Sequence, residues 1–176
     1  MTNSVVWIMG LSGSGKTTTA LALVDTLRLQ GNTVVHLDGD ELRTALDRSG
    51  NFSKDKRIEL ALTYGKLAQL IYNQGFTVVV SSIGLYGALQ SWLRSNIQSY
   101  FEVFLDAPLE LLFKRDFKGI YKMDNGSTRD FVMGVDIEPE FPRNPDVHIH
   151  LNEKMTAKNC VEDILKSLNS LAKLDR

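Results

Sequence analysis

The chain has 176 residues, about the length of one domain, and 43% of them are hydrophobic and 23% charged. Twenty Lys and Arg residues stand against 21 Asp and Glu residues, a formal net charge of −1, which provides no global positive surface for nucleic acid or an anionic membrane. The single cysteine, Cys160, excludes an intramolecular disulfide and a cysteine-rich zinc site. We therefore expect a single domain over residues 1–176, with basic character confined to a local pocket.

The N-terminal residues do not have the pattern of a secretory signal, because no Lys or Arg precedes the short apolar run that ends at Gly10. No apolar stretch approaches the roughly 20 residues that span a bilayer. These features, together with the sparse cysteine, predict a soluble protein of the cytoplasm.

Short apolar runs alternate along the chain with segments of helical period. Strands are expected at residues 5–9, 33–37, 76–81, 100–105 and 147–151. Helices are expected at about residues 17–30, 41–48, 54–73, 86–96, 109–115 and 156–171. Alternation of this kind predicts the α/β class, with a parallel five-stranded sheet flanked by helices.

Residues 117–144 interrupt this alternation, because they are polar and show no sustained period. A loop of that length inside a compact domain usually has a function of its own or is disordered. We expect it to be a lid over the active site.

Residues 10–17, with the sequence GLSGSGKT, match the phosphate-binding pattern G-x-x-x-x-G-K-[ST] between an expected strand and an expected helix. Glycines allow the loop to turn its backbone N–H groups toward phosphate oxygens, and the following helix N-terminus favours an anion. Lys16 would reach the β- and γ-phosphates, and the Thr17 hydroxyl would bind Mg²⁺. The alternative is a glycine-rich helix entry without a ligand. The residues expected to bind ATP here are Gly10, Ser12, Gly13, Ser14, Gly15, Lys16, Thr17 and Thr18.

The class of nucleotide-binding protein is narrowed by what the sequence lacks. No Asn-Lys-x-Asp segment, which a GTPase would use to recognise its base, is present. A small-molecule kinase with the P-loop NTPase kinase fold suits the length, with ATP and Mg²⁺ as cofactors and a small acceptor molecule as substrate.

The second expected strand ends in Asp38-Gly39-Asp40, followed by Arg43. Ligands of open α/β sheets bind beyond the carboxyl ends of the strands, so these carboxylates are expected beside the phosphate-binding loop. A carboxylate there can take the proton of an attacking hydroxyl and support Mg²⁺, while Arg43 can face an anionic acceptor. The alternative is a turn with a helix cap.

These motifs together resemble the adenylylsulfate kinase family. The resemblance rests on GLSGSGKTT, on LDGDxxR at residues 37–43, on FEVFLDAPLE at residues 101–110, and on the segments KRD, KGIYK, GVD and EPE at residues 114–140. It implies ATP-dependent phosphorylation of the 3′-hydroxyl of adenylylsulfate, in sulfate assimilation, by an enzyme that often forms dimers.

The resemblance also implies roles for individual residues. Asp38 corresponds to the catalytic base, acting with Lys16, and Arg115 to the residue that packs against the base of ATP. The implied acceptor-binding residues are Asp40, Arg43, Phe52, Arg57, Ile83 and the lid residue Lys122.

The sequence departs from the family pattern mainly on the acceptor side. Leu60 stands where the family usually has Asn, and the two arginines that follow it in the family are absent. Gly84 and Gly87 replace a serine and an arginine after the third strand. This leaves open a divergent adenylylsulfate kinase, a kinase of another nucleotide conjugate such as cytidine diphosphoramidate, and a nucleotide-binding protein without catalytic activity.

The remaining histidines and the cysteine carry weaker signals. His148 and His150 alternate on an expected strand and resemble a metal-binding pair, but a strand-end or surface role is favoured over metal binding. His36 is interpreted as a core imidazole with a hydrogen-bond partner, and Cys160 as a small buried hydrophobic residue.

Overall fold

The computed structural model describes residues 3–47, 53–116, 119, 121 and 132–174. The strands are β1 (Val5–Met9), β2 (Val34–Asp38), β3 (Thr77–Ser81), β4 (Tyr100–Asp106) and β5 (Val147–His150). The helices are α1 (Lys16–Leu29), α2 (Gly39–Ala45), α3 (Lys54–Tyr72), α4 (Gly87–Asn96), α5 (Leu109–Arg115) and α6 (Ala157–Leu174). Every expected strand and helix is present, and the ends differ by a few residues.

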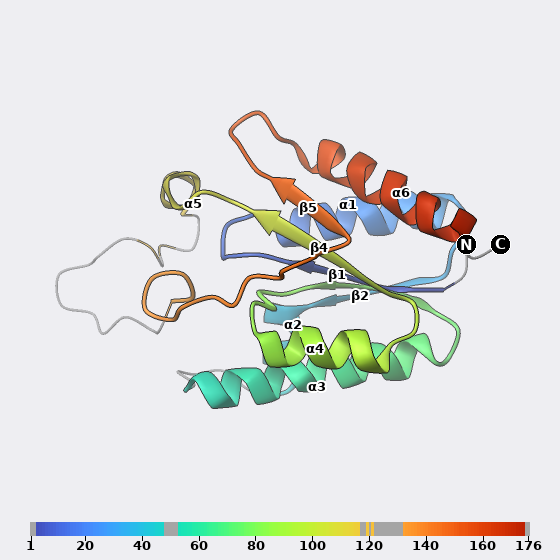
Figure 1. Ribbon diagram of the computed structural model, residues 1–176, viewed down its shortest axis with the longest axis horizontal. Coiled ribbons are helices and arrows are strands. Elements are labelled where there is room, and N and C mark those ends of the chain that lie inside the picture. The colour runs from blue at the N-terminus through green and yellow to red at the C-terminus, as the bar shows by residue number, and fades with distance from the viewer. Residues whose placement is uncertain (1–2, 48–52, 117–118, 120, 122–131, 175–176) are drawn as a thin grey trace.

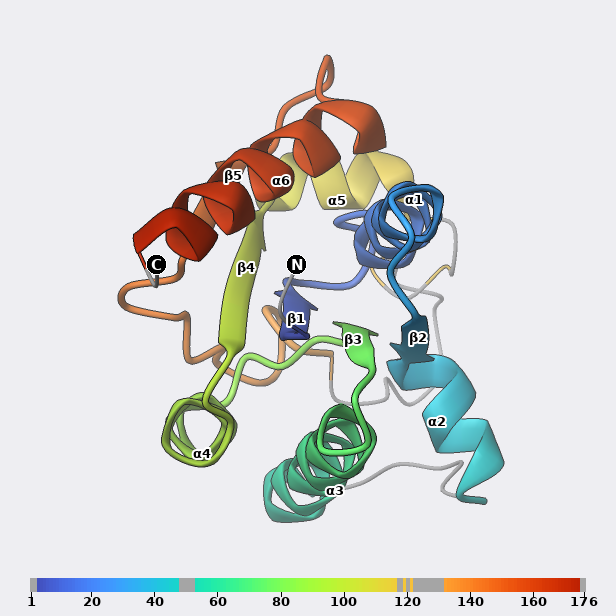
Figure 2. The ribbon, with the colours of Figure 1, turned by 90° about the vertical axis from the view of Figure 1, so that its right-hand side faces the viewer.

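The five strands form one parallel sheet in the order β2-β3-β1-β4-β5. Helices α1 and α6 cover one face, and α3 and α4 cover the other (Figures 1 and 2). The α/β fold with a five-stranded parallel sheet and flanking helices is therefore confirmed.

The burial of each strand follows its place in the sheet. All five residues of β1 and all five of β3 are buried, because both strands are central and both faces are covered by helices. The edge strands β2 and β5 contain partly exposed residues. The apolar runs VVWIM and TVVVS thus form the centre of the core, with Trp7 completely buried.

Helix α2 begins at Gly39, two residues before its expected start. Asp38 is the N-cap, and its side chain accepts hydrogen bonds from the backbone N–H groups of Asp40 and Glu41. A cap of this kind satisfies donors that otherwise have no intrahelical partner, so the helix can start directly at the end of β2.

The carboxyl ends of the strands meet at one edge of the sheet, because all five strands are parallel. The phosphate-binding loop follows β1, and Asp38 and Ser81 end β2 and β3. This edge is where open α/β sheets bind their ligands. Within the described residues, no helix is both long and apolar enough to cross a membrane.

Candidate active site

The loop at residues 10–15 joins the central strand β1 to α1 in a form that glycine permits. Gly15 is the N-cap of α1 with a φ of 86°. Because glycine has no side chain, the first N–H groups of α1 have no side-chain cap from this residue. A Cβ atom at Gly10 would lie 2.6 Å from the carbonyl oxygen of Leu105. The close approach of the loop to β4 and the uncapped N-terminus of α1 are both features of an anion-binding loop.

Ser14 provides an independent test of whether this loop suits a phosphate. Its hydroxyl oxygen is buried and makes no hydrogen bond to any described residue. Buried polar atoms in native proteins almost always have a partner. The Ser14 hydroxyl is therefore suited to donate a hydrogen bond to an oxygen of a bound anion. Nearby, Lys16 Nζ donates a hydrogen bond of 2.9 Å to the carbonyl oxygen of Leu11, which holds the ammonium group over the loop.

Asp38 is the most highly connected side chain of the site. Its Oδ2 accepts hydrogen bonds from Thr17 Oγ1 at 2.8 Å and Ser81 Oγ at 2.7 Å, while its Oδ1 accepts from the N–H groups that it caps. Burial by itself raises the pKa of Asp38, but these hydrogen bonds outweigh burial and hold the pKa below its usual value. Asp38 therefore combines two features that the sequence presented as alternatives, because it caps α2 and also lines the cavity described below.

The network continues through Ser81, which lines the cavity described below, to His36, which does not. The Nε2 atom of His36 lies 2.9 Å from Ser81 Oγ, and Ser81 donates its own proton to Asp38. Burial lowers the pKa of His36, more than the neighbouring carboxylate of Asp38 raises it, which favours the neutral imidazole. His36 was expected to have a hydrogen-bond partner, and Ser81 is that partner. The role of Ser81 was missed, although serine at the carboxyl end of β3 was visible in the sequence.

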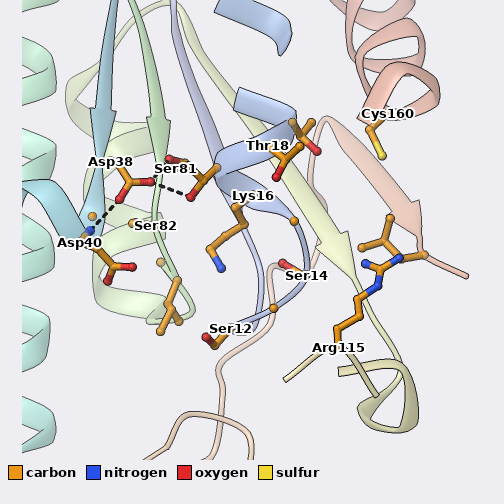
Figure 3. Close-up of a pocket in the computed structure, with 18 of the residues that line it drawn as sticks. Ser12, Ser14, Lys16, Thr18, Asp38, Asp40, Ser81, Ser82, Arg115 and Cys160 are labelled. Atoms are coloured by element: carbon orange, nitrogen blue, oxygen red, sulfur yellow. Dashed lines mark hydrogen bonds between the residues drawn. The ribbon is translucent and has the colours of Figure 1, made fainter. Parts of the chain in front are cut away.

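The phosphate-binding loop, Asp38 and Ser81 border a cavity of about 530 Å³ that runs along the edge of the sheet (Figure 3). Asp38 and Asp40 lie at one side of Lys16, and Arg115 and Cys160 lie at the other. The cavity brings together most residues that the sequence suggested: Ser12, Gly13, Ser14, Gly15, Lys16, Thr17, Thr18, Asp38, Asp40, Arg43, Arg57, Ile83 and Arg115. Phe52 and Lys122 lie outside the described residues, and Gly10 does not line the cavity although it shapes the loop.

The wall beyond Asp38 combines arginines with phenol groups. Arg43 forms a 3.2 Å ion pair with Asp40, and its guanidinium acts on the Tyr64 phenol, whose O–H donates to the carbonyl oxygen of Gly39 over 3.3 Å. Arg57 hydrogen-bonds the Tyr86 phenol. Burial raises the pKa of both tyrosines despite the neighbouring arginines, so both phenols remain protonated donors at neutral pH. The sequence reasoning missed these tyrosines, because each lies on a different element from the arginine beside it and more than 20 residues away in the chain, so the pairs form only on folding.

Leu60 lies in the same wall and is partly buried against the core. Gly84 lines the cavity too, and a Cβ atom there would lie 2.9 Å from Trp7 Nε1. This end of the cavity is therefore a mixture of two cations, two phenols and apolar surface.

The opposite end of the cavity is formed by the last residue of α5 and the turn between β5 and α6. Arg115 ends α5, and the cavity is also lined here by Leu151, Met155 and Cys160. Cys160 is buried as expected. A guanidinium beside apolar side chains can stack on a flat ring system.

Two segments that follow α5 in the chain contact the phosphate-binding loop. The Tyr121 phenol donates a 2.9 Å hydrogen bond to the carbonyl oxygen of Ser12, and burial raises the pKa of Tyr121 to about 12. Residues 132–137 form a tight turn, in which the Gly134 N–H donates to Ile137 O at 2.8 Å. Gly134 lies so close to Leu11 that a Cβ atom there would be 3.0 Å from the leucine side chain.

Comparison with known proteins places this geometry in a family. The family model described as Adenylylsulphate kinase matches residues 2–150. The chain is 35% identical over 166 residues to the cytidine diphosphoramidate kinase of Campylobacter jejuni, covering 93% of this chain and 95% of that protein. It is 37% identical over 165 residues to the adenylyl-sulfate kinase of a Synechococcus strain, covering 94% of each.

The fold also matches solved structures. A Mycobacterium tuberculosis APS kinase, determined in complex with AMPPNP and APS, aligns with a TM-score of 0.83 and 30% sequence identity, covering 95% of this chain and 98% of that one. The similarity extends over nearly the whole of both chains, and the phosphate-binding loop and Asp38 are part of the matched region. The chain therefore belongs to the adenylylsulfate kinase family of small-molecule phosphotransferases.

Proposed function

We propose that this protein transfers the γ-phosphoryl group of ATP to the 3′-hydroxyl of adenylylsulfate, giving ADP and 3′-phosphoadenylylsulfate. The observation that carries the proposal is that one cavity contains both halves of such a site. The phosphate-binding loop lies in its middle, Asp38, Arg43 and Arg57 line one end, and Arg115 with apolar side chains lines the other. The structure of a relative that is 30% identical was determined in complex with AMPPNP and APS. A cavity with a phosphate-binding loop between two different ends suits such a pair of ligands.

On the donor side, the loop binds the phosphates through backbone N–H groups and the Ser14 hydroxyl, which has no hydrogen-bond partner among the described residues. Lys16 moves its ammonium from Leu11 O to the β- and γ-phosphate oxygens, where it stabilises the charge of the phosphoryl group in transfer. The adenine ring lies against Arg115 and the apolar side chains of the α6 turn.

The oxygen ligands at the start of α1 suit Mg²⁺, which prefers oxygen and retains several waters. Thr17 Oγ1 would hold the ion directly, and Asp38 would hold it through a water. An ion held there would supply positive charge that offsets the charge of the phosphoryl group during transfer.

On the acceptor side, Arg43 and Arg57 bind the phosphosulfate and Asp38 accepts the proton of the attacking 3′-hydroxyl. The oxygen of that hydroxyl forms the new bond to phosphorus, and the bond to the β–γ bridging oxygen of ATP breaks. The low pKa of Asp38 suits a base that takes the proton late, after most of the phosphoryl transfer has occurred. Of the expected lid at residues 117–144, Tyr121 and Gly134 contact the phosphate-binding loop, while residues 117–118, 120 and 122–131 lie outside the described residues.

A second candidate acceptor is cytidine diphosphoramidate. Leu60 and Gly84 line the acceptor end without offering charge or an amide, and the relative from Campylobacter jejuni carries that name. Both candidates share the donor site and the base, so the acceptor wall alone separates them.

An ADP-release assay with a panel of acceptors tests the proposal. We expect Mg-ATP turnover with adenylylsulfate and a much lower rate with cytidylyl conjugates or plain nucleosides. The reverse order would replace the first acceptor by the second, and no turnover with any acceptor, despite ATP binding, would support a binding protein without catalytic activity. Lys16→Ala serves as the control for contaminating kinases.

A further inference from the structure

Three potential metal-binding side chains meet at the carboxyl ends of β4 and β5. Asp106 Oδ2 lies 3.0 Å from His148 Nε2 and 3.2 Å from His150 Nδ1. One ligand atom from each of the three residues can be chosen so that all lie within 4.8 Å of one another. The two imidazole rings lie side by side, with their centroids 4.1 Å apart.

The fold brings a carboxylate from another strand to the two histidines, for which the sequence favoured a surface role over metal binding. His148 and His150 project to the same face because they alternate on β5, and the parallel register pairs His150 with Asp106 of β4. Asp106 is more than 40 positions away in the sequence, so ligand spacing along the chain could not reveal it.

We propose that Asp106, His148 and His150 form a binding site for a divalent transition-metal ion such as Zn²⁺. Two ligands at about 2.0–2.1 Å from one zinc ion are about 3.3–3.4 Å apart at the tetrahedral angle. The two carboxylate–imidazole distances of 3.0 and 3.2 Å are close to this separation, and one ligand atom from each residue lies within 4.8 Å of the others, so side-chain rotations can bring all three ligands to one ion. Imidazole with one carboxylate is a ligand set that suits zinc and its neighbours and not Mg²⁺.

The cluster packs against neighbouring residues on one side and is exposed to solvent on the other. His148 packs against the ring of Phe104 with a centroid distance of 5.0 Å, and Phe104 packs against Phe141. The backbone of Asp106 is held to the next segment, since Leu151 N donates to Asp106 O over 2.7 Å. The side chains of Asp106 and His148 are each 39% exposed and that of His150 is 76% exposed, so an ion can enter from solvent and retain a water.

The cluster is separate from the cavity of the proposed kinase site. None of its three residues lines that cavity, whereas the following residue Leu151 does. A bound ion would cross-link the ends of β4 and β5 and stabilise the folded chain by mass action, independently of any phosphoryl transfer. The competing interpretation is a set of hydrogen bonds and ion pairs that needs no metal.

Titration calorimetry with Zn²⁺ on chelator-treated, tag-free protein distinguishes the two interpretations. We expect one saturable zinc equivalent that depends on the cluster, with Mg²⁺ unable to replace it there, and a rise of the thermal midpoint on zinc addition. His148→Ala, His150→Ala and Asp106→Asn should each weaken zinc binding by at least about tenfold, because loss even of an outer-shell partner costs about 10–100-fold. Asp163→Asn, an exposed carboxylate on α6, is the matched control and should bind zinc as the unchanged protein does.

A second measurement guards against variants that fail to fold. Each variant is first compared with the unchanged protein by circular dichroism and thermal unfolding in the presence of chelator. Cobalt titration of the folded variants then reports the ligands directly, because a four-coordinate Co²⁺ ion absorbs visible light strongly. Zinc binding that stays unchanged in a folded His148→Ala/His150→Ala double variant, or no saturable zinc binding by the unchanged protein, would overturn the proposal.

Discussion

Thr17 Oγ1 donates a 2.8 Å hydrogen bond to Asp38 Oδ2, and this contact joins the first turn of α1 to the carboxyl end of β2. Helix α1 follows β1, and β1 is not a neighbour of β2 in the sheet, since β3 lies between them. Ser81 at the end of β3 donates to the same oxygen over 2.7 Å. The carboxylate is therefore held from two elements beside the phosphate-binding loop, where the proposed base and magnesium ligand must lie together.

We predict that Asp38→Asn removes phosphoryl transfer and leaves ATP binding largely intact. Asn is as good an N-cap as Asp, so α2 retains its start, but the amide cannot accept the proton of the acceptor hydroxyl. The turnover number should fall by at least about 10²-fold. Steady-state ADP release and ATP-binding calorimetry measure the two effects separately.

Asp40→Asn is the matched control for this prediction, because Asp40 lies two residues away and pairs with Arg43 at 3.2 Å. We expect it to raise the KM for the acceptor more than it lowers the turnover number. Near-normal turnover in Asp38→Asn would show that the base is another group.

Lys16→Ala is predicted to lower turnover by about 10²- to 10³-fold or more, because it removes a cation that stabilises developing charge in transfer. The Lys16 ammonium donates a 2.9 Å hydrogen bond to Leu11 O, and the substitution removes this one donor from a loop carbonyl. Thermal unfolding should therefore change far less than turnover does. A variant that unfolds readily at assay temperature would instead indicate a structural role.

Leu60→Asn is predicted to improve use of adenylylsulfate, because it returns to the acceptor wall an amide that the family usually has there. One new hydrogen bond of ordinary strength would raise kcat/KM by about fivefold. Comparing kcat/KM for adenylylsulfate and a cytidylyl conjugate in both proteins checks this. An improvement with the cytidylyl conjugate instead would favour the second acceptor.

Glu140 caps α4 from a distant part of the chain, since its Oε2 accepts the Gly87 N–H over 2.8 Å while its Oε1 accepts from Lys54 Nζ over 2.7 Å. Tyr86, the N-cap residue of α4, makes no side-chain capping bond. Glu140→Ala should lower the free energy of unfolding by about 1 kcal/mol, the usual value of a lost helix cap. Urea unfolding measures it.

Lys54→Met separates the cap from the ion pair, because it removes only the exposed partner of Glu140. We expect a clearly smaller loss of stability than in Glu140→Ala, since exposed ion pairs contribute little. Equal losses in the two variants would locate the stabilisation in the ion pair.

His36 is predicted to make the protein less stable as the pH falls from 7 toward about 5. Burial, as the largest effect, lowers its pKa in the folded protein, with Arg28 acting in the same direction and Asp38 and Glu41 against it. The unfolded chain therefore binds more protons below the ordinary histidine pKa of about 6.5, and folding stability declines as pH drops through that range. Urea unfolding of the unchanged protein and His36→Gln at both pH values should show a weaker decline in the variant, and equal declines would contradict the assignment.

The sequence by itself determined the fold class and the phosphate-binding-loop motif. Apolar runs alternating with helical segments specify a parallel sheet, and GLSGSGKT carries its chemistry in adjacent residues whose spacing is local. The positions of Asp38 and Arg43 followed from the rule that ligands bind beyond the strand ends.

Only the tertiary structure decided which distant side chains meet. The register of β2 with β3 brings Ser81 to Asp38, the register of β4 with β5 brings Asp106 to two histidines, and the return of residues 138–140 brings Glu140 to the start of α4. None of these contacts leaves a pattern along the chain, because strand register and long-range packing are set by the whole core. Local spacing therefore revealed the phosphate-binding loop, while the hydrogen-bond network of the proposed base and the histidine–aspartate cluster became visible only in the folded sheet.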